Sequence, residues 1–208
     1  CWIPDFEDNG GLSGDLSHPA RCPVPAYYIG LQSRFSPGKP SRQGHDYDLM
    51  VVISGPEPQR GIFEDMVMQQ LRDFSGRALV VLGKPEEDIR FTMGKGIEIR
   101  GHMGTQEMQE ALMRSELVIS RPGYTSIMDL AILGKRAAFV PTPGQTEQEY
   151  LAAYHAMKRN YYSMPQAVFN IGAAVKASRN YPGLQLQTDA GMLEQRVDEL
   201  LQRMRLPR

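Results

Sequence analysis

The sequence predicts an α/β protein built on a doubly wound parallel sheet. From residue 46 onward, short continuous apolar runs alternate with segments in which apolar residues recur at helical spacing. An unbroken apolar run is typical of a strand that is buried on both faces of a sheet. Short right-handed crossovers then place all the strand-to-helix turns along one edge of the sheet.

Composition bounds the class of protein. The chain has 208 residues, of which 41% are hydrophobic and 23% charged, enough for one domain with a sizeable core. The net charge is −1, so we expect neither nucleic-acid binding nor strong attraction to acidic membranes.

Cysteine usage and hydropathy indicate the compartment. Cys1 and Cys22 form no CxxC pair and no Cys/His cluster at zinc spacing, so we expect two free thiols and no metal site. No apolar run reaches 18 residues, so we expect no membrane-spanning helix. A cytoplasmic protein fits these features.

Residues 1–45 differ from the rest of the chain. They are rich in Gly and Pro, which predicts loops and linker, with one short strand over residues 24–29 that Pro25 restricts to an edge or a strand start. We therefore divide the chain into an appendage, residues 1–45, and one α/β domain, residues 46–208.

The elements of the domain follow in order from these two patterns. Four of the expected strands are short apolar runs that end near Gly, Pro or Ser, and the helices carry apolar residues at about helical spacing. Thr105 and Gly134 are typical of a helix start and a helix end. We expect strands at 49–53, 78–82, 97–100, 117–119 and 137–140, and helices at 60–74, 105–113, about 127–133, 147–158, 166–178 and 189–204.

The turn after the first of these strands is a candidate phosphate site. Ligands of open parallel sheets bind outside the carboxyl ends of the strands. Gly55 lets a ligand approach the backbone closely, and Arg60 could pair with a phosphate. No GxGxxG is present, so a dinucleotide fingerprint is not supported.

The turn after the fourth of these strands carries the most chemistry. Backbone amides of Gly123, Tyr124 and Thr125 at a helix start could cradle a diphosphate, and Arg121 could add positive charge. Asp129, one to two turns along that helix, could accept hydrogen bonds from both hydroxyls of a ribose.

The turn after the fifth of these strands also holds polar side chains. Thr146 and Glu149 are explained as a capping box, whereas Gln145 and Gln148 have no such structural reason and could bind sugar hydroxyls.

Arg121-Pro122-Gly123 with Asp129, followed by Pro141 and residues 144–148 (Gly-Gln-Thr-Glu-Gln), resembles the C-terminal domain of GT-B glycosyltransferases. The most similar families are the MurG-like group, glycosyltransferase family 28, and the UDP-glycosyltransferases. The resemblance covers about residues 46–160 and implies a Rossmann-like fold, the C-terminal half of the GT-B architecture.

The resemblance also implies roles for single residues. Asp129 falls on the residue that binds ribose, and Gly123, Tyr124 and Thr125 fall on the diphosphate loop. Gln148 falls on the donor-sugar contact, with Glu147 or Gln145 beside it. The segment 101–104 falls on the loop that grips the base, so that Met103 would pack on it, and Gly55 falls on the loop that closes over the phosphates.

Departures from the family pattern leave the donor sugar open. The first loop has Gly-Pro-Glu-Pro in place of Gly-Gly-Ser, Leu151-Ala152 replaces Asn-Ala, and Asp129 replaces the usual Glu.

The implied function is the donor-binding part of a metal-independent transferase that moves a sugar from a nucleotide sugar, most simply a UDP-sugar, to an acceptor hydroxyl. The resemblance implies no further cofactor. The acceptor, the catalytic base and any peripheral membrane contact would belong to a missing N-terminal domain, and the opening residues, Trp2 to Phe6, resemble the end of that domain. His18 and His102 receive no catalytic role.

Two alternatives stay open at this point. One is a UDP-sugar 2-epimerase of the same architecture, and the other is a non-catalytic nucleotide-binding module.

Overall fold

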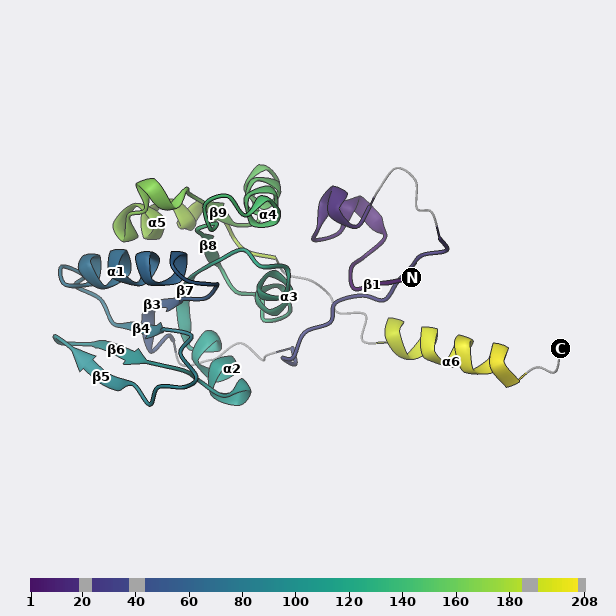
Figure 1. Ribbon diagram of the computed structural model, residues 1–208, viewed down its shortest axis with the longest axis horizontal. Coiled ribbons are helices and arrows are strands. Elements are labelled where there is room, and N and C mark those ends of the chain that lie inside the picture. The colour runs from purple at the N-terminus through teal and green to yellow at the C-terminus, as the bar shows by residue number, and fades with distance from the viewer. Residues whose placement is uncertain (19–23, 38–43, 185–190, 206–208) are drawn as a thin grey trace.

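The computed structural model describes residues 1–18, 24–37, 44–184 and 191–205 (Figure 1). These residues include a seven-stranded sheet with the order β5-β6-β4-β3-β7-β8-β9, parallel except for the antiparallel β5–β6 pair. Helices lie on both faces of this sheet, so the predicted doubly wound α/β architecture is confirmed. The strands are β3 (Tyr47–Val52), β4 (Ala78–Val81), β5 (Arg90–Met93), β6 (Ile97–Arg100), β7 (Ser115–Ser120), β8 (Ala137–Phe139) and β9 (Tyr162–Ser163).

The central strand β3 shows why its sequence is a continuous apolar run. Met50 packs into the hydrophobic cluster on one face of the sheet, and Leu49 and Val51 pack into the cluster on the other. Adjacent residues of a strand point to opposite faces, so a strand covered on both faces needs apolar residues at every position.

The helices divide between the two faces. Helices α1 (Gln59–Leu71) and α5 (Ile171–Ala177) contribute to the cluster that contains Leu49, whereas α2 (Thr105–Met113), α3 (Tyr124–Ile132) and α4 (Thr146–Met157) contribute to the cluster that contains Met50. Helices α2, α3 and α4 each begin at the carboxyl end of a strand, as right-handed crossovers require, and α1 begins there too.

Some predicted elements needed correction. The helix expected over residues 166–178 is instead a 3₁₀ turn, η3 (Gln166–Val168), followed by α5, because the Asn170 side chain accepts a hydrogen bond from the Ala173 amide at 2.8 Å and starts a new helix there. Strands β5 and β9 were not predicted. They are short, lie at the two edges of the sheet, and lack a run of apolar residues.

The described parts of the N-terminal arm, residues 1–18 and 24–37, are packed rather than loose. They contain β1 (Trp2–Ile3), paired in parallel with β2 (Tyr27–Tyr28), and the 3₁₀ turns η1 (Asp8–Gly10) and η2 (Gly14–Leu16). The strand expected at 24–29 therefore survives only as β2. Cys22 lies outside the described residues.

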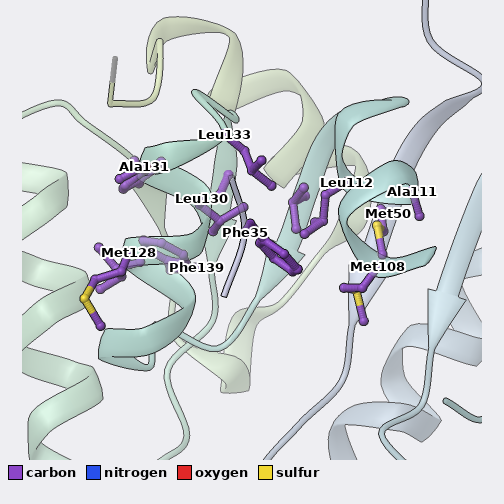
Figure 2. Close-up of a cluster of buried hydrophobic side chains, with 14 of the residues drawn as sticks. Phe35, Met50, Met108, Ala111, Leu112, Met128, Leu130, Ala131, Leu133 and Phe139 are labelled. Atoms are coloured by element: carbon purple, nitrogen blue, oxygen red, sulfur yellow. The ribbon is translucent and has the colours of Figure 1, made fainter. Parts of the chain in front are cut away.

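Phe35 anchors the end of the arm in the domain. Its side chain is 3% exposed and lies in the crevice between α2 and α3, beside Leu112, Leu130 and Leu133 (Figure 2). The Gln109 side chain of α2 also donates to the Ser36 carbonyl at 3.0 Å. The segment that leads into the domain is thus held against both helices.

Helix α6 (Met192–Arg205) runs away from the sheet, close to β1 (Figure 1). The expected start of this helix, residues 189–190, lies outside the described residues. The Arg196 guanidinium lies over the Tyr27 ring, with its carbon 5.0 Å from the ring centre, so α6 contacts the small β1–β2 sheet. Within the described ranges, no helix combines the length and the hydropathy needed to cross a bilayer.

Candidate functional site

The topology places the first and second predicted turns at the switch point of the sheet. The chain proceeds from β3 through β4 to β6 on one side and then returns to add β7 on the other side of β3. Ligands of doubly wound sheets bind at the carboxyl edge where the strand order reverses. The loops that follow β3 and β7, which carry Gly55 and Gly123, meet at this point.

The third turn joins the same edge. Gly55 has a φ of +103°, and a Cβ atom there would lie 3.9 Å from the Thr142 Oγ1 atom. The left-handed φ favours glycine at this position. Thr142 follows β8, the neighbour of β7, so the three turns form one continuous edge, which the proposed ligand site requires.

The start of α3 is open to a ligand. Gly123 is the N-cap, with no side-chain cap, and no hydrogen bond within the described residues uses the backbone amides of Gly123, Tyr124, Thr125 or Ser126. A Cβ atom on Gly123 would meet only the Ser126 Oγ atom, at 3.8 Å. Free amides at the positive end of a helix dipole are suited to bind a phosphate.

Tyr124 contacts protein as well. Its hydroxyl donates to the Pro4 carbonyl at 2.7 Å, and burial, with a smaller contribution from Asp5, raises the pKa of this phenol. The side chain therefore ties α3 to the N-terminal arm, while the Tyr124 amide remains free for a ligand.

Asp129, the expected ribose ligand, has two partners that the sequence did not reveal. The Ser33 hydroxyl donates to its Oδ1 atom at 2.6 Å, and the Arg34 Nε atom lies 3.3 Å from its Oδ2 atom. The Asp129 side chain is 14% exposed, whereas Arg34 is 54% exposed. Both partners come from the N-terminal arm, about a hundred positions earlier, so no local pattern could have indicated them.

Arg121, which was expected to add positive charge at the diphosphate, is buried, and its part in donor binding stays a prediction. This residue is 2% exposed, and its guanidinium donates to four oxygens of the protein. The side chain turns into the interior from the end of β7, below the three turns.

Arg60 also has protein partners. Its guanidinium lies 2.6 Å from a Glu57 carboxylate oxygen and donates to the Gly83 carbonyl at 2.9 Å. The hydrogen bond with Arg60 is the main reason that the pKa of Glu57 is lowered. A phosphate would have to compete with Glu57 for Arg60, and the role expected of Arg60 stays a prediction.

The contact of Met103 with a base stays a prediction. Met103 is 8% exposed and belongs to the hydrophobic cluster that also holds Phe35, whereas His102 beside it is exposed. In this loop after β6, the backbone groups of Gly101 and Gly104 are hydrogen-bonded within the protein, which leaves those of His102 and Met103 for the expected contact with the base.

The start of α4 differs from the predicted capping box. The N-cap is Gln145, Thr146 is the first helical residue, and the Glu149 carboxylate accepts from the Gly144 amide at 2.9 Å. Thr105 of α2 is likewise the first helical residue, after the N-cap Gly104. In both cases the residue before the hydroxyl already has extended backbone angles, so the hydroxyl residue enters the helix.

Gln148 fixes the loop after β8. Its Oε1 atom accepts from the Thr142 amide at 2.9 Å, and the residue is 7% exposed. Gln145 and Glu147, in contrast, are exposed at the start of the helix. Gln148 thus has a structural partner that the sequence did not indicate, and the sugar contacts expected of the three side chains stay predictions.

Asp5 organises the arm beside this site. Its carboxylate is fully buried and accepts from the amides of Leu12 and Ser13 and from the Ser13 hydroxyl, at 2.8, 3.0 and 2.5 Å. The loop so formed packs on α4, where the Tyr154 hydroxyl donates to the carbonyls of Gly10 and Gly11 at 3.0 Å. Within the described residues, no group of three or more His, Cys, Asp or Glu side chains is arranged to hold a metal ion.

Residues 82–181 match the family described as glycosyltransferase family 28 C-terminal domain. Among curated protein sequences, none matches the chain significantly.

Solved structures share the fold. The chain superposes with a TM-score of 0.60 on MurG from Acinetobacter baumannii, at 14% identity over 89% of the chain, and with 0.60 on the glycotransferase of kitacinnamycin, at 15% identity over 88%. Arabidopsis thaliana UGT89C1, solved with quercetin, gives 0.52 at 14% identity over 87%. The chain spans 58%, 49% and 51% of these three proteins, so it corresponds to about half of each.

Proposed function

We infer that this chain, whose residues 82–181 match the glycosyltransferase family 28 C-terminal domain and whose fold is that of GT-B glycosyltransferases, is the donor-binding half of a glycosyltransferase. The proposed donor is a nucleoside diphosphate sugar, most simply a UDP-sugar. The observation that carries the proposal is the open start of α3 at the switch point, with Asp129 one to two turns further along the helix.

The diphosphate of the proposed donor lies at the amides of Gly123, Tyr124 and Thr125. These amides are fixed by the helix, so they need no reorganisation when charge develops on the leaving diphosphate. This arrangement supports departure of the nucleoside diphosphate without a bound metal, and metal independence is part of the proposal.

The ribose of the donor is proposed to lie against Asp129. A carboxylate offers about four acceptor positions, so Asp129 can accept from ribose hydroxyls while it keeps its hydrogen bonds with Ser33 and Arg34. The sugar then points towards the start of α4, where the side chains of Gln145, Glu147 and Gln148 are proposed to bind its hydroxyls.

The acceptor and the base that activates it are proposed to belong to a second domain. The β1–β2 pair supports this idea, because parallel sheets are normally larger and covered on both faces, and an isolated two-stranded sheet is marginally stable. We propose that β1, β2 and α6 form the border of that second domain, supplied by a longer polypeptide.

The donor site is tested by calorimetric titration of the chain with UDP. We expect Asp129→Ala to weaken binding of UDP and of uridine alike, by about tenfold or more, because both ligands carry the ribose and lose hydrogen bonds to a charged group. Asp65→Ala, which removes an exposed carboxylate on α1, is the matched control and should bind as the unaltered chain does.

Equal affinities of the unaltered chain and Asp129→Ala would remove the ribose assignment. Melting curves with UDP, GDP and TDP would identify the nucleotide, because a ligand that binds only the folded state raises the melting temperature.

A further inference from the structure

Arg121 is a buried cation with neutral partners. It donates to the carbonyls of Val140, Pro141 and Gln59 at 2.8, 3.1 and 3.3 Å, and to the Gln166 side-chain oxygen at 2.5 Å. Its guanidinium carbon also lies 4.2 Å from the centre of the Phe63 ring.

The charge of Arg121 has no counter-ion in the described part of the chain. No carboxylate there forms an ion pair with it, and burial alone lowers the pKa of this guanidinium to about 10. Removing a charge from water without an opposite charge nearby is costly. Arg60, at the same edge, has Glu57 as its partner, so the absence of a carboxylate is specific to Arg121.

The helix dipoles make the position of Arg121 more unfavourable still. Gln59 is the first residue of α1, Arg121 itself precedes α3 by three positions, and Pro141 begins the loop that leads to α4. The positive end of α1 therefore lies at the buried positive charge, and α3 and α4 begin within a few residues of Arg121 and Pro141. Lys135, the other buried cation, contacts the carbonyls of Met113 and Ser115 at the negative end of α2, where a cation is favoured.

A second observation at this edge concerns a buried hydroxyl. Thr142 is 6% exposed, its amide is bound to Gln148 and its carbonyl to the Gln145 amide, yet its hydroxyl has no partner. That hydroxyl faces Gly55, across the loop after β3. A buried hydroxyl without a partner is costly, and a ligand oxygen that reached this gap would satisfy it.

We propose that Arg121 is a positioning residue for the diphosphate of the donor. Its side chain holds the three loops together from the interior of the protein. The diphosphate, bound on the outer side of these loops, acts as the counter-ion of Arg121. The proposal rests on the donor-binding function proposed above and assigns Arg121 an indirect part in it. Affinity for the charged ligand then depends on the charge of Arg121, although Arg121 does not touch the ligand.

Gln166→Glu tests this proposal by giving Arg121 a counter-ion from within the protein. The new carboxylate has the shape of the amide that already accepts from Arg121, and the Gln59 amide, 3.1 Å away, can turn to donate to it. We expect the melting temperature of the free protein to be unchanged or higher. We expect UDP to bind about tenfold more weakly, the effect of neutralising one charge near an anion in a poorly screened environment.

Uridine separates this effect from a general disturbance of the site. It carries no phosphate, so its affinity for Gln166→Glu should stay within about twofold of that for the unaltered chain. Gln69→Glu, on the exposed side of α1, adds the same charge without a buried contact and should leave both affinities unchanged. A merely structural role of Arg121 would not weaken UDP binding while the fold is as stable as before.

The outcomes are distinguishable. If the unaltered chain binds neither UDP nor uridine, the donor-binding function itself is wrong and this proposal falls with it. If the unaltered chain binds UDP and a stable Gln166→Glu binds it equally well, only the role of Arg121 is overturned. Should Gln166→Glu not fold, Gln59→Glu places a carboxylate in the same cluster at the first turn of α1, and the same loss of UDP affinity without loss of uridine affinity is expected.

Discussion

His155 links the N-terminal arm to the domain by a hydrogen bond, and its two ring nitrogens have partners that fix its protonation state. Its Nε2 atom donates to the Leu12 carbonyl at 2.9 Å, because a carbonyl can only accept, and its Nδ1 atom accepts from the Asn160 amide group at 3.2 Å. The ring is fully buried. A proton added at Nδ1 would face a second donor, so the folded protein holds His155 neutral.

This arrangement predicts a pH dependence of stability. Burial, with a smaller effect of Lys158, lowers the pKa of His155 to about 4, below the value near 6.5 expected in the unfolded chain. Because the unfolded state binds the proton more readily, the stabilisation is complete above pH 6.5 and is lost as the pH falls from 6.5 towards 4. Between pH 7 and pH 5 the loss in the free energy of unfolding should be roughly 2 kcal/mol.

Urea unfolding at pH 7 and pH 5 measures this loss. His155→Gln, which keeps a donor for Leu12, should lack most of it, and His102→Gln, at an exposed position, should behave as the unaltered chain does. Equal pH slopes for the unaltered chain and His155→Gln would contradict the assignment.

Residues near the site could be predicted from the sequence only as far as local patterns reach. Gly123 and Asp129 stand in a recognisable order within one turn and one helix, so the open start of α3 was accessible to reasoning. The partners of Arg121 and Asp129 come from Gln59, Gln166 and Ser33, many positions away. The burial of Arg121 depends on how separate loops meet, which no local pattern encodes.

At the scale of elements, burial decides which strands the sequence reveals. The strands β3, β4 and β7 are covered on both faces and consist of apolar runs, so they were predicted within a few residues. The edge strand β5 is mostly exposed and contains Arg90 and Thr92, and β9 has two residues, so neither has a pattern of its own. The packing of the arm was missed for a related reason, because its contacts are made by backbone groups and single side chains rather than by a periodic face.

The anchor of the arm between α2 and α3 gives the next prediction. Phe35→Ala should lower the free energy of unfolding by about 3 to 5 kcal/mol, the usual cost of removing a buried phenylalanine side chain. It should also free Ser33 and Arg34 from Asp129, because Phe35 follows them directly. Trypsin would then cleave the bond after Arg34 at a low enzyme concentration at which the same bond of the unaltered chain is resistant.

Phe91→Ala is the matched control for this experiment, because Phe91 is 48% exposed on β5 and its removal should cost little. A destabilised Phe35→Ala in which Arg34 stays resistant to trypsin would mean that the hydrogen bonds to Asp129, rather than Phe35, hold the arm.

At the scale of the whole molecule, the sheet domain and the region around α6 differ in how completely they are covered. The carboxyl edge of the seven-stranded sheet combines a closed core with the open start of α3. The β1–β2 pair and α6 have less around them in the described part of the chain (Figure 1). Helix α6 also carries apolar residues at helical spacing. This contrast agrees with the proposal that α6 borders a second domain.

The exposed side of α6 gives a prediction for the isolated chain. Leu200, Leu201 and Met204 are 46%, 43% and 74% exposed and lie within one turn of each other. A contiguous apolar surface of this kind favours association in water, so we expect sedimentation velocity to show self-association that increases with protein concentration. The double variant Leu201→Gln/Met204→Gln should remain monomeric, whereas Met157→Gln, at a 76% exposed methionine on α4, should associate as the unaltered chain does.

In a longer polypeptide that includes the second domain, the same double substitution should instead lower the melting temperature, because the side chains would then be buried. A monomeric unaltered chain, or a double variant that associates equally, would show that this side of α6 is an ordinary solvated surface and would remove it from the proposed border.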